Sequence, residues 1–543
     1  MANAFFKIDK PTNEPVLGYG PGSPEKQSLK AKLAELRGTE YEIPLVLGGK
    51  EVRTNDLGEC RMPHDHAHRL ATYHKAGTDE VRAAIEAAME AWQTWSRTAW
   101  QDRLAIFLKA ADLLSGPRRD LLNAATMLGQ DKNVFQAEID SACELIDFLR
   151  FNSYYATQIY QDQPDSARGV WNRLEYRPLE GFVLAVTPFN FTSIAGNLPT
   201  APAMMGNTVV WKPASSAVYS AYSLMTVLQE AGLPPGVINF LPGPGAVVGE
   251  AALASEHLAG IHFTGSTAVF QQMWRTVGNN VRTYRSYPRI VGETGGKDFI
   301  FVHESADPKA TVAALVRGAF EYQGQKCSAA SRAYIPEGLW PAIRQDLLAE
   351  IRGLKMGSPE DFTNFVNAVI DRPAFETIRQ YIAYARDHDD AEILIGGGCD
   401  DATGYFIEPT VILAGTGDFR TLVEEIFGPV LTVYVYEAGK FAETLELCDR
   451  TSPYALTGSI FARDRRAIAQ ATEALRHAAG NFYINDKPTG AVVGQQPFGG
   501  SRASGTNDKA GSMLNLLRWV SPRTIKETFV PPADYRYAFL AEP

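Results

Sequence analysis

Residues 182–213 read FVLAVTPFNFTSIAGNLPTAPAMMGNTVVWKP, and they decide the class of the fold. Two short apolar runs, Phe182–Val186 and Val209–Trp211, stand on either side of a segment that is long enough for a helix. Similar runs follow at Val237–Leu241 and Ile261–Phe263. Strands that alternate with helices in this way predict a parallel sheet with right-handed crossovers.

The same alternation continues beyond this stretch. Toward the C-terminus, a helix is expected over about 308–322 and an apolar run occurs at 430–436, so a second region of this kind is predicted up to about residue 505. Toward the N-terminus, Thr78 can cap a helix whose apolar residues recur at helical spacing. Residues 1 to about 60 are rich in Pro, Gly and charged residues, which predicts an arm over the surface.

Small and polar residues follow the predicted strands at the points where a ligand would bind. They are Thr187-Pro188-Phe189-Asn190, Lys212-Pro213, Pro242-Gly243 and Thr264-Gly265-Ser266-Thr267. Parallel sheets bind ligands at the carboxyl ends of their strands, so a nucleotide is expected there. The sequence has no G-x-G-x-x-G, and the common dinucleotide fingerprint is therefore absent.

Length, composition and charge exclude several classes of protein. The chain has 543 residues, of which 45% are hydrophobic, and a formal net charge of −10. These values fit two large globular domains, or three or four smaller ones, and they argue against nucleic acid or an anionic membrane as the main partner. No apolar run approaches the ~18 residues of a membrane-spanning helix. The N-terminal residues lack the pattern of a secretory signal or transit peptide, so a cytoplasmic enzyme is expected, or a mitochondrial matrix enzyme if a transit peptide has been removed.

Cysteine and histidine usage gives no sign of a metal site. The five cysteines form no C-x-x-C pair, which indicates free thiols and neither a zinc site nor a disulfide framework. His64-Asp65-His66-Ala67-His68 has the residue types of a metal site but lacks convergent partners in the sequence, and we expect a surface loop there. No metal is expected.

Cys327 is the cysteine with the most distinctive surroundings. It stands in Gly324-Gln325-Lys326-Cys327-Ser328, a Gly-containing turn after a predicted helix. A thiol in such a turn can be exposed, and a nearby helix start would lower its pKa. Most cysteines, however, are small buried hydrophobic residues, and the motif alone leaves both interpretations open.

Three further polar residues are candidates for chemistry. Glu293, among glycines at a predicted strand end, can act as a general base, although a solvated turn glutamate is the commoner case. The Asn190 amide can donate to a developing oxyanion, or it can satisfy its own turn. Lys212 can bind ribose hydroxyls or phosphate, or it can be an ordinary surface lysine. None of the three decides a function alone.

Taken together, the motifs resemble those of the aldehyde dehydrogenase superfamily over nearly the whole chain. The order Asn190, Lys212, Gly265-Ser266, Glu293, Cys327 and Glu425-Ile426-Phe427-Gly428-Pro429 matches the order in that superfamily. The segment 486–500, DKPTGAVVGQQPFGG, is similar to the anchor loop of its Δ1-pyrroline-5-carboxylate (L-glutamate γ-semialdehyde) dehydrogenase branch, and Ser328 directly after the cysteine fits the same branch.

The resemblance implies an α/β fold and a specific reaction. It implies two doubly wound parallel-sheet domains, one Rossmann-like for the cofactor and one catalytic, with a small β oligomerisation flap. The implied reaction is NAD(P)-dependent oxidation of L-glutamate γ-semialdehyde to L-glutamate through a cysteine thioester, the second step of proline catabolism. In the family pattern Cys327 attacks the aldehyde, Asn190 holds the oxyanion and Glu293 activates water.

The resemblance also implies which residues bind the two reactants. The implied substrate-binding residues are Ser328, Gly490, Ala491, Phe498 and Glu144. The implied cofactor-binding residues are Thr187, Lys212, Ser215, Gly265, Ser266, Thr267, Ala268, Val269, Glu425 and Phe427. Many NAD-preferring relatives carry Glu where this chain has Ser215; a serine would not repel a 2′-phosphate, so NAD is expected first and NADP is possible.

Domain boundaries and assembly follow from the same resemblance. The expected parts are an N-terminal arm over 1–29, an NAD-binding domain over 30–155 and 177–297, a catalytic domain over 298–506, and a flap over 156–176 and 507–543. Antiparallel flap strands present open edges, which favour a homodimer or a higher homo-oligomer.

Two other functions remain open at this point. A related dehydrogenase could act on another aldehyde, such as succinate semialdehyde. A catalytically silent binding or structural protein could use the same scaffold, although the presence of both Cys327 and Glu293 speaks against this.

Overall fold

The structure is a computed structural model that describes residue 4 and residues 6–541. Its first large sheet has seven strands in the order β11-β10-β7-β8-β9-β2-β3. The four apolar runs that the sequence singled out all lie in it, and neighbouring strands from β9 to β11 are parallel. The strands are β7 (Phe182–Val186), β8 (Thr208–Lys212), β9 (Ile238–Phe240), β10 (Leu258–Thr264), β11 (Arg289–Glu293), β2 (Leu45–Leu47) and β3 (Lys50–Val52).

Both faces of this sheet are covered by helices, which explains why its strands are continuously apolar. Val183 and Ala185 face a core whose helices include the four named next, whereas Phe182 and Leu184 face a second core that includes three other helices. The first four helices are α3 (Trp100–Ser115), α6 (Leu145–Gln161), α7 (Thr192–Met204) and α8 (Val218–Ala231). The other three are α2 (Thr78–Trp95), α9 (Gly245–Ala254) and α10 (Thr267–Asn279).

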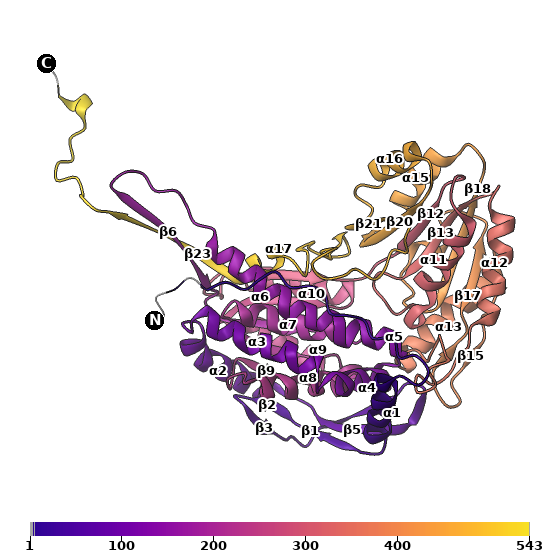
Figure 1. Cartoon of the computed structure of the whole chain (residues 1–543), viewed down its shortest axis with the longest axis horizontal. Coiled ribbons are helices and arrows are strands. Elements are labelled where there is room, and N and C mark those ends of the chain that lie inside the picture. Colours follow the sequence, from indigo (N-terminus) through magenta and orange to yellow (C-terminus); the bar gives the residue numbers. More distant parts are fainter. Residues whose placement is uncertain (1–3, 5, 542–543) are drawn as a thin grey trace.

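The second large sheet also has seven strands, in the order β14-β17-β18-β13-β12-β20-β21. Only β14 runs antiparallel to its neighbour within this sheet. Its elements lie together on the right of Figure 1. The strands are β12 (Asp298–Val302), β13 (Ala330–Pro336), β14 (Ala391–Ile395), β17 (Thr410–Ala414), β18 (Val430–Tyr436), β20 (Thr457–Phe461) and β21 (Asn481–Ile484). The covering helices include α11 (Pro308–Phe320), α12 (Trp340–Gly353), α15 (Phe441–Arg450) and α16 (Arg465–Ala474).

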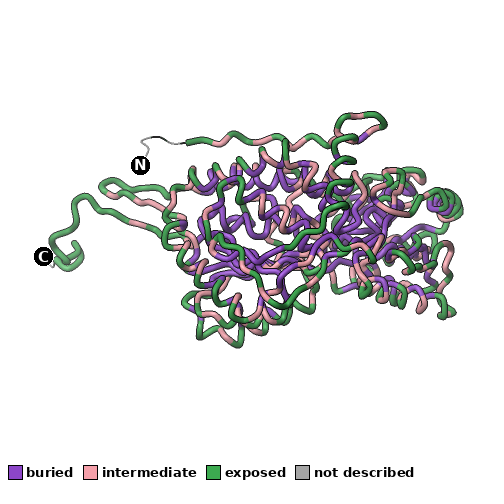
Figure 2. The backbone as a smooth tube through the Cα atoms, turned by 90° about the horizontal axis from the view of Figure 1, so that it is seen from below, coloured by how far each residue is buried: buried purple, intermediate pink, exposed green. Residues whose placement is uncertain are grey.

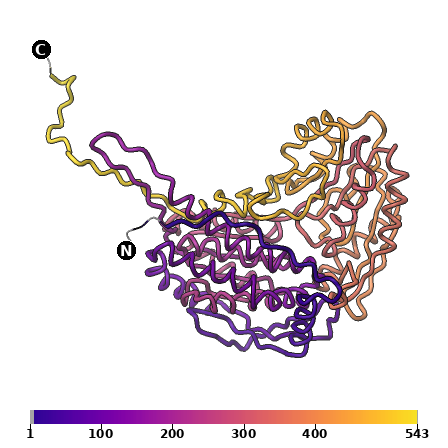
Figure 3. Tube along the Cα trace, viewed as in Figure 1, coloured from indigo at the N-terminus to yellow at the C-terminus, as the bar shows by residue number. Residues whose placement is uncertain are grey.

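The expectation of a surface arm over residues 1–60 is wrong for most of that segment. Residues 24–62 form α1 (Pro24–Arg37), β1 (Tyr41–Ile43), β2, β3 and β4 (Leu57–Met62). The Pro, Gly and charge content hid these short elements because each buries only a few residues. The extended segment before α1 does run over the surface, along the upper edge of the helices in Figure 3.

The expectation of a surface loop around His64 is also wrong. The imidazole of His64 is buried and pairs with the Asp131 carboxylate, and β5 (Asp65–His74) follows directly. Glu360, from the region of the second sheet, approaches the other side of the ring at 3.5 Å. His64 therefore joins the two halves of the molecule.

A two-stranded antiparallel ribbon projects from the body. It pairs β6 (Val170–Pro178) with β23 (Val520–Thr528), strands that are far apart in the sequence. Strand β23 and the tail beyond it are mostly exposed, whereas β6 is mostly half-buried (Figure 2). Across the described residues, each helix is too short or too polar to span a bilayer.

Candidate active site

Two cavities meet at the side chain of Cys327. The larger one, of about 990 Å³, lies along the carboxyl ends of β7, β8 and β10, where the sequence predicted a nucleotide. The smaller one, of about 430 Å³, lies between α6, the loop after β21 and the N-terminal segment. Cys327 lines both, so a group in either cavity can approach the sulfur.

The turn before Cys327 is held rigidly. Tyr322 and Gln323 have positive φ angles of 52° and 54°, a conformation that non-glycine residues adopt only under constraint. The constraint comes from Gln323, whose Nε2 donates to the carbonyls of Asp131 (3.0 Å) and Ala368 (2.8 Å). The sulfur is therefore fixed by backbone that spans both halves of the molecule.

The thiol of Cys327 is not activated by its resting surroundings. Burial raises its pKa well above the ordinary value, and the nearby carboxyl groups of Asp298 and Glu293 add to this. The prediction that a helix start would lower this pKa is wrong, because the turn brings acidic groups close and encloses the sulfur. Formation of the thiolate needs a proton acceptor or a positive charge that enters the site.

Asn190 lies beside this turn, after β7 and before α7. One of its two amide N–H groups donates to the Gln325 carbonyl at 3.0 Å. An amide NH₂ carries two donors, which leaves the second for a group bound at Cys327.

Asp140 holds the start of α7, the helix that follows Asn190. It lies in a π-helix over Glu138–Glu144 and accepts from the backbone N–H groups of Thr192 (2.9 Å) and Ser193 (2.8 Å).

Glu293 is the last residue of β11 and lines the smaller cavity. Its Oε2 accepts from the backbone N–H of Gly500 at 3.0 Å. Burial raises the pKa of this carboxyl well above the ordinary value, and the nearby Asp508 carboxylate raises the pKa further. The Gly500 N–H and the Lys509 ammonium lower the pKa in part. Lys509 itself is held by the carbonyls of Gly480 (2.8 Å) and Gly499 (3.1 Å).

Most of the residues predicted to bind the cofactor line the larger cavity. Those that do are Thr187, Lys212, Gly265, Ser266, Val269, Glu425 and Phe427. Ser215, Thr267 and Ala268 lie outside its lining. Ser215 is exposed, and the Thr267 hydroxyl accepts from the Gly295 N–H at 3.4 Å. Glu425 accepts from the Gly296 N–H at 2.9 Å, and burial raises its pKa to about 7.

The five residues predicted to bind the substrate all line the smaller cavity: Ser328, Gly490, Ala491, Phe498 and Glu144. The Ser328 hydroxyl donates to Thr489 Oγ1 at 2.8 Å. Glu144 accepts from the Ser193 hydroxyl at 3.0 Å, and burial raises the pKa of its carboxyl to about 8. A neutral Glu144 is therefore the dominant form at pH 7.

Sequence reasoning missed several residues of the smaller cavity. Three cationic side chains, Arg317, Lys326 and Lys487, line it, as do Asn13 and other residues of the N-terminal segment. Lys326 pairs with Glu321 at 3.1 Å. Lys326, next to the cysteine, and Lys487, in the segment 486–500, stood in motifs, but the motifs gave them no role; Arg317 and Asn13 join them through tertiary contacts that leave no local pattern.

A sequence model of the Aldehyde dehydrogenase family matches residues 52–525. The chain belongs to the aldehyde dehydrogenase family. This confirms the resemblance that the order of motifs indicated, and the fold expected from it.

Within this family the chain is similar to proteins of one kind. It is 55% identical to the Delta-1-pyrroline-5-carboxylate dehydrogenase, mitochondrial, of Dictyostelium discoideum, over 99% of this chain and 97% of that protein. It is 50% identical to the Homo sapiens protein of the same name, over 98% and 94%. The crystal structure of the Mycobacterium tuberculosis Delta-pyrroline-5-carboxylate dehydrogenase bound with NAD superposes with a TM-score of 0.97, at 52% identity, over 100% of both chains.

Proposed function

We propose that this aldehyde dehydrogenase oxidises L-glutamate γ-semialdehyde, the open form of Δ1-pyrroline-5-carboxylate, to L-glutamate, with NAD as the hydride acceptor. This is the second step of proline catabolism. One observation carries the proposal: the loop around Gly490 and Ala491 lines a cavity that ends at Cys327, and the opposite side of Cys327 opens into the cavity for a dinucleotide. Relatives at 50–55% identity over nearly the whole chain bear the corresponding name.

The first chemical step is attack by the Cys327 sulfur on the aldehyde carbon. The Glu293 carboxylate takes the thiol proton, directly or through water, the S–C bond forms, and the electron pair of the C=O bond moves to the carbonyl oxygen. The free Asn190 amide N–H and the Cys327 backbone N–H stabilise this oxyanion. NAD held in the larger cavity would supply the hydride acceptor; loss of hydride from the same carbon would restore the carbonyl and leave a thioester on Cys327.

The second step is hydrolysis of this thioester. Glu293 takes a proton from water, the water oxygen attacks the thioester carbon, and the sulfur leaves as the thiolate. In the resting structure Glu293 is turned toward the Gly500 N–H. The Gly500 N–H engages only Oε2, so Oε1 is left to take the proton from water.

The far end of the substrate carries an α-carboxylate and an α-ammonium. The Ser328 hydroxyl and the backbone N–H groups of Gly490 and Ala491 bind the carboxylate, and Phe498 packs on the aliphatic part. Glu144 lies close to the aldehyde end of the same cavity. Lys326 and Lys487 line this cavity together with carboxyl groups such as Glu144, so groups of both signs are present for an amino-acid end.

Substrate comparison tests the proposal. NADH formation is measured with Δ1-pyrroline-5-carboxylate, with succinate semialdehyde and with propanal. We expect kcat/KM to be at least about a hundredfold higher for the first, because unpaired polar groups in the cavity disfavour substrates that lack the amino-acid end. A preference for succinate semialdehyde or propanal would contradict the proposed substrate.

A comparison of the two cofactors is a separate test. With NADP in place of NAD we expect slower but measurable turnover, because the serine at position 215 does not repel the 2′-phosphate of NADP.

We propose that the ribbon of β6 and β23 joins two copies of the chain into a homodimer or a higher homo-oligomer. Its strands form a sheet of only two, so their outer edges are open to a third strand. Trp171 is 48% exposed on β6. Light scattering should give at least twice the 59.5 kDa of one chain, and Trp171→Asp should weaken the association. A monomeric wild-type protein at micromolar concentration would contradict the assignment.

The domain boundaries remain part of the proposal: an arm over 1–29, a cofactor-binding domain over 30–155 and 177–297, a catalytic domain over 298–506, and a flap over 156–176 and 507–543. The division at 297/298 is supported by the change of sheet. The last strand of the first sheet ends at Glu293 and the first strand of the second begins at Asp298.

A further inference from the structure

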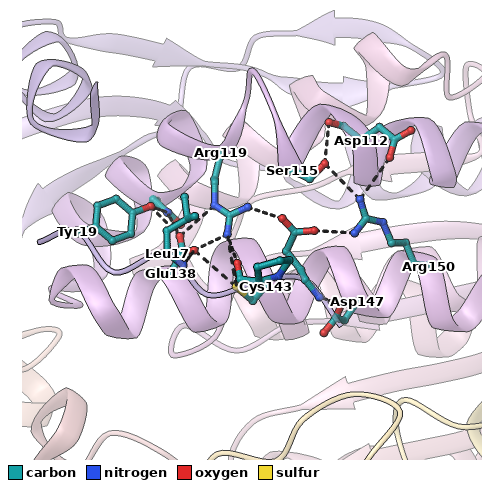
Figure 4. A network of polar contacts seen from close by, with 12 residues as sticks. Leu17, Tyr19, Asp112, Ser115, Arg119, Glu138, Cys143, Asp147 and Arg150 are labelled. Atoms are coloured by element: carbon teal, nitrogen blue, oxygen red, sulfur yellow. Dashed lines mark hydrogen bonds and ion pairs between the residues drawn. The ribbon is translucent and has the colours of Figure 1, made fainter. Parts of the chain in front are cut away.

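The N-terminal segment from Asn13 to Tyr19, here called the N-terminal strap, is fixed to the body by a buried polar network. Figure 4 shows Arg119 at its centre. Arg119 binds Glu14 at 2.6 Å and also pairs with Glu138. Glu138 in turn accepts from the Leu17 N–H and from the Tyr19 hydroxyl, each at 2.8 Å.

A second arginine holds the same strap from α6. Arg150 binds the other oxygen of the Glu14 carboxylate at 2.6 Å. The Glu14 N–H donates to Asp147 at 2.8 Å. Charge-assisted hydrogen bonds of this kind are strong when they are partly buried, and here they act on both ends of one short segment. The strap is therefore an ordered wall, although it carries no helix or strand.

Asn13, at the start of the strap, joins two parts of the smaller cavity. Its Nδ2 donates to Asp147 on α6 at 2.7 Å and to the carbonyl of Val493 at 2.8 Å. Its Oδ1 accepts from Gln495 Nε2 at 2.8 Å. Val493 and Gln495 belong to the loop that presents Gly490 and Ala491. One side chain thus fastens this loop to the helix on the opposite wall.

The loop needs such a fastening because it contains no regular secondary structure. Gly490 and Gly494 have φ angles of 95° and 81°, and glycine-rich backbone of this kind loses much entropy when it is ordered. Val493 packs against Phe148 and Phe151. This apolar contact holds the middle of the loop in place but does not fix the direction in which its backbone N–H groups point. At the start of the loop, Thr489 is held by hydrogen bonds from Ser328 and Lys487, and Asn13 adds the directional contacts that fix the loop beyond Ala491.

We propose that Asn13 is a positioning residue for the amino-acid end of the substrate: it holds the loop so that the Gly490 and Ala491 N–H groups point at the α-carboxylate. This inference rests on the proposed function. It adds a specificity determinant from the N-terminal strap, which lies outside the residues matched by the family model.

Kinetics of Asn13→Ala with two aldehydes test the inference in the full-length protein. Propanal carries the reacting aldehyde but has no carboxylate for the loop to bind. For L-glutamate γ-semialdehyde we expect kcat/KM to fall about tenfold, mainly through KM, as the loss of hydrogen bonds worth about 1.4 kcal/mol would produce. For propanal we expect a change of less than about twofold, because oxyanion and hydride chemistry are untouched. Thr12→Ala, at an exposed neighbour in the same segment, is the matched control and should match the wild type.

A second variant keeps the test decisive if Asn13→Ala folds poorly. Gln495→Ala removes one of the two contacts from the loop side and leaves the strap intact. It should raise KM for the semialdehyde about threefold, with propanal again unchanged. An unchanged KM for the semialdehyde in Gln495→Ala, or an equal loss for both aldehydes in Asn13→Ala, would overturn the inference. Failure of the wild type to prefer the semialdehyde would instead overturn the proposed function.

Discussion

Lys132 and Asp140 form a completely buried ion pair, with Nζ and Oδ2 separated by 2.7 Å, behind the two segments that carry Asn190 and Cys327. The Lys132 ammonium lies 3.9 Å from the ring centre of Phe191 and 4.6 Å from that of Tyr322. Phe191 follows Asn190, and Tyr322 belongs to the turn before Cys327. The pair therefore supports both the segment of the oxyanion donor and the turn that carries the sulfur.

Breaking this pair should cost both stability and activity. Asp140→Asn keeps the shape of the side chain but leaves the Lys132 charge uncompensated, and removal of one partner of a buried pair costs about 3–5 kcal/mol. We expect a loss of this size in the free energy of unfolding from denaturant titration, and a lower kcat. The double variant Lys132→Met/Asp140→Asn should recover part of the stability. Glu424→Gln is the control, because it removes one partner of an exposed ion pair with Arg420. If Asp140→Asn lowered the free energy of unfolding as little as Glu424→Gln does, the structural role of the buried pair would be contradicted.

Replacement of the reactive sulfur should separate chemistry from binding. Cys327→Ala should lower NADH formation by roughly a thousandfold or more, because no other nucleophile stands at this point. The affinity for NAD, measured by fluorescence titration, should change by less than about twofold, because the larger cavity extends far beyond the sulfur. Cys399→Ala alters a cysteine that lines neither cavity and should retain full activity. Substantial turnover by Cys327→Ala would exclude the thioester route.

The parts of the fold that the sequence predicted are those with a local pattern. The runs at Phe182–Val186 and Val209–Trp211 are strands because both faces of the sheet are covered, and this produces uninterrupted apolar runs. Asn190 and Glu293 could be singled out as candidates because their motifs lie at strand ends. His64 was placed wrongly because its partner, Asp131, is distant in the sequence.

The properties that remained hidden depend on contacts between distant segments. Asp140 has no motif, and its role comes from the start of α7 and from Lys132. Asn13 stands in a stretch without periodicity and gains its role from Asp147 and Val493. The raised pKa of Cys327 likewise reflects acidic groups from several elements, which no reading of the turn alone reveals.

The charge of Lys509 should control the pH range of thioester hydrolysis. Its ammonium favours the ionised form of Glu293 and holds the pKa of that carboxyl lower than burial alone would place it. Lys509→Met should therefore raise this pKa, and the acidic limb of the pH profile of kcat should move to higher pH. At pH 7 the turnover should fall severalfold where hydrolysis limits the rate. Lys50→Met, at an exposed position on β3, should leave the profile unchanged. A shift toward lower pH, or none, would contradict this electrostatic role.

The buried carboxyl of Glu144 should make the protein less stable as the pH rises. Burial raises its pKa to about 8 from an ordinary value of 4.5, so between these values the folded state binds the proton and the unfolded state does not. The free energy of unfolding therefore decreases with pH over this interval, since stability falls wherever the folded state holds more protons. Glu144→Gln removes the titration and can keep the hydrogen bond from Ser193. Thermal unfolding is measured from pH 5 to 8. Over this range, the Tm of Glu144→Gln should decrease less than that of the wild type. Glu86→Gln, at an exposed position, is the control and should follow the wild type. Parallel curves for Glu144→Gln and the wild type would show that Glu144 ionises without cost in the folded protein.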